Sequence, residues 1–191
     1  VGSHAGIQTG EDGATHQALE DIAIMRTIPN MKVFCPADAV EMKKMLPVVL
    51  GDYGPAYIRL SRQAVPVIYD DFYSFKIGKG DVLMDGDDIG IIATGTLVSS
   101  CLAAAEKLKA SGMSVRLVNM STIKPIDSIL IEETARKVKM LVTAEDHQVT
   151  GGLSGAVAEV LSQTFPKKLY KIGMHDRFGE SGKSADLYKK Y

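Results

Sequence analysis

Cysteine, net charge and long apolar runs are all scarce in this 191-residue sequence. The two cysteines, Cys35 and Cys101, lie far apart without CxxC or His-rich spacing, which favours reduced core residues over a disulfide or a metal site. The formal net charge is −1 and Lys and Arg are scattered, so no nucleic-acid or membrane surface is indicated. The sequence contains neither a signal-peptide pattern nor a membrane-spanning run. We therefore expect a soluble, cytoplasmic protein.

The hydrophobic content of 46% is enough for a normal core. In the first third of the chain, apolar spacing predicts helices over residues 15–27 and 37–51 and strands over 32–35 and 56–60. This alternation is typical of a parallel α/β sheet. It covers about half of a typical doubly wound domain, and the sequence begins at Val1 without an initiator Met. We therefore expect a piece of a longer protein, whose other residues supply the missing strands.

The second half has the pattern of a more complete α/β domain, which follows a Pro- and aromatic-containing crossing at residues 63–80. Strands are predicted over 88–93, 114–120, 138–143 and 169–172, with helices that begin after residues 96, 125 and 151. Glycines stand at two strand-to-helix turns, at Gly95 and at Gly151-Gly152. They allow tight turns, which is the interpretation we favour, or they cradle an anion at a helix N-terminus.

Residues 10–17, Gly-Glu-Asp-Gly-Ala-Thr-His-Gln, are the most informative stretch. Glycines on both sides of Asp12 let the backbone turn tightly and approach a ligand. The segment leads into a predicted helix, and His4 stands shortly upstream of it. A carboxylate with two imidazoles, those of His4 and His16, suits polyol or phosphate recognition and proton transfer. The alternatives are an ordinary Asp-Gly turn, an ordinary histidine in a first helical turn, and a tag remnant at residues 2–4.

Motifs along the whole chain resemble the transketolase family. In the first half they are the 10–17 segment, Arg-Thr-Ile-Pro-Asn-Met at 26–31, Pro-Ala-Asp at 36–38 and Tyr-Ile-Arg-Leu-Ser-Arg at 57–62. In the second half they are Ile-Lys-Pro-Ile-Asp at 123–127, Thr-Ala-Glu-Asp-His at 143–147 and Gly-Gly-Leu at 151–153. The sequence most resembles the C-terminal subunit of split transketolases. Deoxyxylulose-phosphate synthase shares Asp-Gly-Ala-Thr-His, but Gln17 and the residues after it favour transketolase, and 2-oxoacid dehydrogenase β subunits lack the Thr-His-Gln pattern.

The resemblance implies a fold and a reaction. The fold is α/β: the latter part of a doubly wound pyrimidine-binding domain at residues 1–66, a linker at 67–80 and a transketolase C-terminal α/β/α domain at 81–191. The reaction is transfer of a two-carbon ketol unit between phosphorylated sugars of the pentose phosphate pathway. Thiamine diphosphate supplies the ylid and the electron sink for this chemistry.

The resemblance also implies roles for four residues. His4 and Arg62 match residues that bind the sugar phosphate, which a guanidinium fork suits well. Asp12 matches a carboxylate that reads sugar hydroxyls, and His16 matches a catalytic histidine beside the thiazolium. Residues 145–147 are interpreted as structural or interface-forming, with an anion site at the following helix as the alternative, and are left out of the catalytic set.

Two features of the family have no counterpart in this sequence. The glutamate that activates the cofactor and the aromatic pocket for its pyrimidine ring should lie upstream of Val1. The diphosphate and its divalent cation, Mg or Ca, are expected on a separate N-terminal transketolase subunit, in a homodimer or heterotetramer. We expect this chain alone to be inactive. The alternatives are a 1-deoxyxylulose-5-phosphate synthase and a non-catalytic fragment that serves in assembly.

Overall fold

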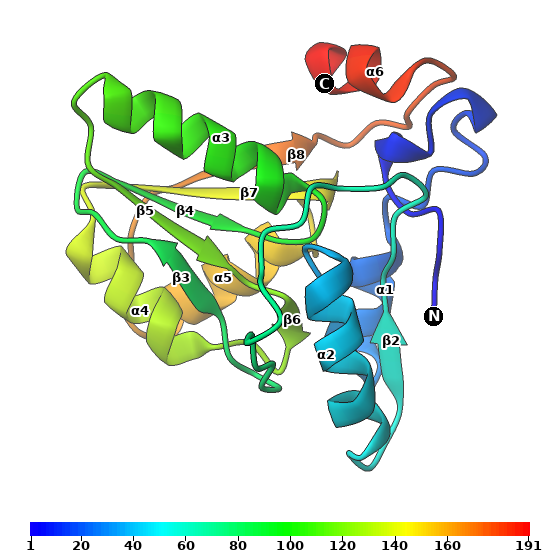
Figure 1. Ribbon diagram of the computed structural model, residues 1–191, viewed down its shortest axis with the longest axis horizontal. Coiled ribbons are helices and arrows are strands. Elements are labelled where there is room, and N and C mark those ends of the chain that lie inside the picture. Colours follow the sequence, from blue (N-terminus) through cyan, green and yellow to red (C-terminus); the bar gives the residue numbers. More distant parts are fainter.

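The computed structural model describes residues 1–191, which form two β-sheets with helices packed on them (Figure 1). The larger sheet has five strands in the order β3-β5-β4-β7-β8. Four of them run parallel, and β3 pairs antiparallel with β5 at one edge. The strands are β3 (Asp81–Met84), β4 (Ile89–Ala93), β5 (Val115–Asn119), β7 (Met140–Gln148) and β8 (Leu169–Met174).

Helices cover both faces of this sheet, which accounts for the continuous burial of its central strands. Helix α3 (Leu97–Ala110) lies on one face, and α4 (Ser128–Lys137) and α5 (Leu153–Gln163) lie on the other (Figure 1). Asp127 caps α4, because its carboxylate accepts the backbone N–H of Leu130. The chain ends in a short helix, α6 (Ser184–Lys190). No helix has both the length and the apolar character needed to cross a membrane.

The smaller sheet joins the two halves of the chain. Its order is β2-β1-β6, in which β1 (Lys32–Phe34) and β2 (Ala56–Ile58) are parallel and come from the first half. The third strand, β6 (Thr122–Lys124), comes from the second half and pairs antiparallel with β1. Helix α2 (Ala39–Leu50) connects β1 to β2. Sequence periodicity predicted β1, α2 and β2 but missed β3, β6 and α6, all of which are short.

The helix predicted over residues 15–27 is wrong in its first part. The helix there, α1, runs only over Asp21–Thr27. Tertiary contacts hold the preceding residues in a turn and irregular backbone: Ala18 bridges Ala5, and the Gln17 side chain donates to the carbonyls of Gly10 and Glu180. These contacts give polar groups of the segment partners without helical hydrogen bonds, so the 10–17 motif does not lead directly into a helix.

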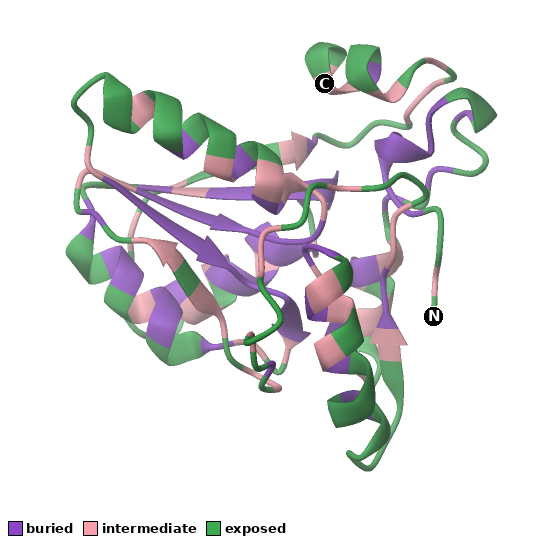
Figure 2. Cartoon of the chain, viewed as in Figure 1, coloured by how far each residue is buried: buried purple, intermediate pink, exposed green.

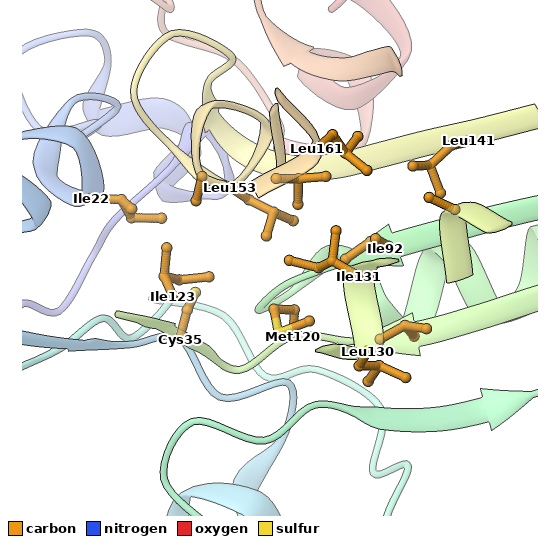
Figure 3. Close-up of a cluster of buried hydrophobic side chains, with 14 of the residues drawn as sticks. Ile22, Cys35, Ile92, Met120, Ile123, Leu130, Ile131, Leu141, Leu153 and Leu161 are labelled. Carbon is orange, nitrogen blue, oxygen red and sulfur yellow. The ribbon is translucent and has the colours of Figure 1, made fainter. Parts of the chain in front are cut away.

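One hydrophobic cluster spans both halves of the chain (Figure 3). Ile22 and Cys35 from the first half pack with Met120, Ile123 and other residues of the second half. Burial is most continuous in the central strands, whereas much of α2 and the turn after it are exposed (Figure 2). Cys35 and Cys101 are buried free thiols, as predicted.

Residues 63–80 form no helix or strand, yet they pack against both halves. Phe75 is buried against Phe34 of β1, edge to face. The hydroxyl of Tyr73 donates to Glu41, and Asn119 donates to both Glu41 and the hydroxyl of Tyr69. Glu41 is fully buried, and desolvation raises the pKa of its carboxyl. The crossing therefore fills a polar seam between the sheets.

Candidate substrate site

A tight loop carries Asp12 to Arg62. Residues Ile7–Asp12 form two short 3-10 turns, together η1, that meet at a kink at Gly10, where φ is 79°. This positive φ is costly for residues with a Cβ, which explains a glycine at this position. Nη1 of Arg62 donates to the Asp12 carboxylate at 2.6 Å and to the Thr9 carbonyl at 3.1 Å. The ion pair is 37% exposed at Asp12 and 42% at Arg62, so a ligand has access to both side chains.

The two histidines lie within electrostatic reach of this pair. The hydrogen bond from Arg62 lowers the pKa of the Asp12 carboxyl, against an opposing effect of burial. The charges of His16 and His4 lower the same pKa further. The structure thus brings all four predicted site residues to one exposed region of the first half.

Both imidazoles are exposed and bonded only to a neighbouring hydroxyl. His4 Nδ1 lies 3.0 Å from Ser3 Oγ, and His16 Nδ1 lies 2.9 Å from Thr15 Oγ1. In each ring Nε2 has no protein partner, so it is free to bind a ligand. The backbone of His4, at φ 62°, is held by the Thr9 hydroxyl, which donates to the His4 carbonyl at 2.6 Å.

A polar depression of about 290 Å³ adjoins the ion pair. Its lining includes two cations, Arg62 and Lys183, and one acid, Glu11. His4, Asp12 and His16 lie outside this lining. The depression is lined by Thr9, Gly10, Glu11, Arg62, Gln63, Gly182, Lys183 and Ser184.

The second-half segment of this depression was missed at the level of sequence. Residues 179–184 are rich in Gly and Ser, which are turn-forming residues, and that composition was the available signal. That composition predicts a loop but gives no sign of a contact with the first half. In the structure the Ser181 hydroxyl donates to the Glu11 carbonyl, 170 positions earlier in the sequence.

The anion site considered beside Gly151 is wrong, because the protein's own carboxylate fills that position. Both oxygens of Glu145 accept backbone N–H groups at the start of α5, from Leu153 at 2.6 Å and Ser154 at 2.8 Å. A Cβ at Gly152 would overlap the same carboxylate. Burial raises the pKa of Glu145, against these hydrogen bonds. Residues 145–147 lie within β7, and all three are buried inside the chain.

The other turn glycines also allow close packing. A Cβ at Gly95 would lie 2.6 Å from Cys35 Sγ, and one at Gly151 would lie 2.7 Å from the Ala23 Cβ. Side chains of the first half therefore occupy the space that an anion would need. The favoured interpretation of these glycines, tight turns, agrees with this packing.

A buried arginine links the two halves below the loop. Arg59 Nε donates to the Asp21 carboxylate, and its Nη2 donates to the carbonyls of Ala18 at 3.0 Å and Asp146 at 2.8 Å. Burial, together with the charge of Arg59, lowers the pKa of His147 to about 4. His147 is therefore neutral at pH 7.

No group of three or more His, Cys, Asp or Glu side chains is arranged to hold a metal ion. The free Nε2 of the exposed His16 suits a cofactor that approaches from outside this chain.

Family models match nearly the whole chain. The pyrimidine-binding domain of transketolase matches residues 1–67, and the transketolase C-terminal domain matches residues 78–191. The chain belongs to the transketolase family. A "Putative transketolase C-terminal section" of Methanocaldococcus jannaschii is 50% identical over all of this chain and 60% of its own length. A 1-deoxy-D-xylulose-5-phosphate synthase of Caldanaerobacter subterraneus is 40% identical over 98% of the chain and 30% of its own length.

A solved transketolase structure has the same fold. It is described as "Split gene transketolase, inactive beta4 tetramer", with a TM-score of 0.92 and 45% identity. The match covers 99% of this chain and 60% of that one. The chain thus spans about 60% of the length of the Methanocaldococcus jannaschii relative and of the split-gene transketolase. The mixed α/β fold, with a pyrimidine-binding and a C-terminal domain, is confirmed by these matches.

Proposed function

We propose that this chain is part of the C-terminal subunit of a split transketolase of the cytoplasm. It supplies one side of a site that transfers a two-carbon ketol unit between phosphorylated sugars, and an N-terminal subunit supplies the other side. The observation that carries the proposal is the exposed Arg62–Asp12 ion pair, with His4 and His16 beside it.

Arg62 and His4 would bind the sugar phosphate. Both hydrogen bonds of Arg62 use Nη1, so Nη2 and Nε are free for a phosphate in the bidentate manner that guanidinium favours. Nε2 of His4 adds one further donor when it is protonated. Lys183 places a second cation in the adjoining depression.

Asp12 and His16 would act nearer to the reacting carbons. Asp12 stays ionised because of its lowered pKa, so its carboxylate accepts hydrogen bonds from sugar hydroxyls. His16 presents an exposed imidazole whose Nε2 can hold or move a proton at a substrate hydroxyl. These two residues orient the sugar while Arg62 binds its charged end.

Thiamine diphosphate would supply the ylid that attacks the ketose carbonyl. Within this chain His16 is the residue suited to lie beside it. The diphosphate and its Mg or Ca ion would be held by the N-terminal subunit.

The test is a ketol-transfer assay with the complete subunit and its separately expressed N-terminal partner. Ketol transfer from a phosphorylated ketose to an aldose that requires both subunits and thiamine diphosphate is the expected result. No transfer with both subunits and cofactor present would overturn the proposal.

Two other functions have specific support. The 40% identity to a deoxyxylulose-phosphate synthase favours that reaction, which consumption of pyruvate with glyceraldehyde 3-phosphate would reveal. A neighbour described as an inactive β4 tetramer favours a role in assembly. That role predicts oligomers that do not bind thiamine diphosphate, as measured by calorimetry and analytical ultracentrifugation.

A further inference from the structure

The loop that carries Asp12 rests on the C-terminal domain. In open parallel sheets, ligands bind at the carboxyl ends of the strands, where the strand order reverses. In the larger sheet this point lies between β4 and β7, and the protein's own η1 and α6 lie beside it (Figure 1). Residues of the loop that carries Asp12 therefore lie at this end of the larger sheet, in contact with β7 and α6.

The main anchor of the loop is Asp146 of β7. Its carboxylate accepts the backbone N–H of Ile7 at 2.9 Å and that of Gln8 at 3.4 Å. The Tyr188 hydroxyl of α6 donates to the same carboxylate at 2.8 Å. Asp146 is 5% exposed, so it does not itself meet a substrate. A Cβ at Gly6 would overlap this carboxylate, which shows how closely the loop approaches it.

Two serines at the end of the chain hold the rest of the loop. Ser184 Oγ donates to the Gln8 carbonyl at 2.9 Å, and Ser181 Oγ donates to the Glu11 carbonyl at 2.5 Å. The loop is thus bonded at both of its ends by groups that belong to the second half. Within η1 itself Gly10 interrupts the helical geometry, so few local bonds define its shape.

We propose that Asp146, oriented by Tyr188, is a positioning residue that sets the place of Asp12 in the substrate site. The proposal rests on the proposed function in one respect, that Asp12 contacts the sugar. Because the loop is already ordered before the sugar binds, binding does not lose the conformational entropy of ordering it. Loss of the anchor therefore weakens sugar binding through Asp12.

Amide hydrogen exchange tests the anchor without any activity. In the complete subunit, Asp146→Ala should speed exchange of the Ile7 and Gln8 amides by about tenfold or more. Asp146→Asn, which keeps one acceptor oxygen, should give an intermediate effect, and Tyr188→Phe a smaller one of about threefold. The control is Tyr170→Phe in β8, whose hydroxyl makes no hydrogen bond and whose loss should leave these amides unchanged.

Should Asp146→Ala fail to fold, Tyr188→Phe still decides the question, because it removes one hydroxyl and keeps the ring. Unchanged exchange of the Ile7 and Gln8 amides in folded Tyr188→Phe and Asp146→Asn would overturn the anchor. An equal rise across the whole domain would also overturn it, because general loosening explains that result.

Kinetics of the assembled enzyme test the link to Asp12. Tyr188→Phe should raise KM for the phosphorylated sugar about fivefold and change kcat less. In an Asp12→Ala background the same substitution should change KM less than about twofold, because the residue to be positioned is gone. Equal effects in both backgrounds would overturn the positioning role. Absence of ketol transfer in the wild-type enzyme would refute the proposed function, and exchange would then still report on the anchor.

Discussion

Replacement of Arg59 by Met should be among the most destabilising single changes in this chain. The guanidinium is 6% exposed, and its main partner, Asp21, is 12% exposed. Met keeps much of the side-chain volume but leaves the Asp21 carboxylate without a cation. The Asp146 carbonyl also loses the Arg59 donor, whereas the Ala18 carbonyl keeps the backbone N–H of Gly6. Breaking a buried ion pair in this way costs about 3–5 kcal/mol of unfolding free energy.

Arg116→Met is a matched control for the same chemistry. Arg116 is 10% exposed, but its partner Asp85 is 59% exposed and also pairs with Lys137. Water and Lys137 can therefore stabilise the charged Asp85 carboxylate when Arg116 is removed. We expect Arg116→Met to lose less than half as much unfolding free energy as Arg59→Met. The measurement is urea unfolding of the complete subunit followed by circular dichroism. Equal losses in the two variants, or a loss below about 1 kcal/mol for Arg59→Met, would refute the reasoning.

Three further predictions concern the site and its support. In the assembled enzyme, Arg62→Ala should lower kcat/KM for phosphorylated sugars by roughly 30-fold and for non-phosphorylated ones by less than about threefold; a uniform loss in steady-state assays would contradict a phosphate role. His16→Ala should lower kcat by about a hundredfold, and an unchanged kcat would remove it from proton handling. The pKa of His147 is about 4 in the folded protein against 6.5 in the free side chain. Between these values the unfolded state binds a proton that the native state does not. The stability contribution is therefore full above pH 6.5 and is lost as pH falls toward 4, by up to about 3 kcal/mol. Urea unfolding of His147→Gln should show a correspondingly weaker pH dependence over this window, and an identical dependence in both proteins would show that His147 protonates in the native state.

Local patterns in the sequence predicted most of the regular structure. The strand Ile89–Ala93 and the helix Leu97–Ala110 follow from apolar runs and spacing that depend only on neighbouring residues. The same holds for α2 and for the two buried cysteines. Glycine spacing and residue chemistry indicated Asp12, His4 and His16, and motif resemblance added Arg62. The structure places Asp12 against Arg62 from positions 50 apart.

Where local signals competed with distant contacts, the distant contacts decided. Residues 15–20 have helical spacing, but Gln17 bonds to Glu180 and Ala18 bridges Ala5, so α1 begins at Asp21. The short strand β6 has no pattern of its own and exists because β1 offers it a partner. Propensity is a weak influence over a few residues, and such pairings override it.

The sequence by itself determined the α/β class, the family and the chemical groups available for a substrate site. Only the tertiary structure decided how those groups are held, because the holding bonds join residues that no local pattern relates. Asp146 meets Ile7 across 139 positions, and Ser184 meets Gln8 across 176. Glu145 illustrates the same point at closer range: its acid-histidine neighbourhood resembled an anion or catalytic site, and folding made it the cap of α5. A buried carboxylate must find donors, and which donors it finds depends on packing.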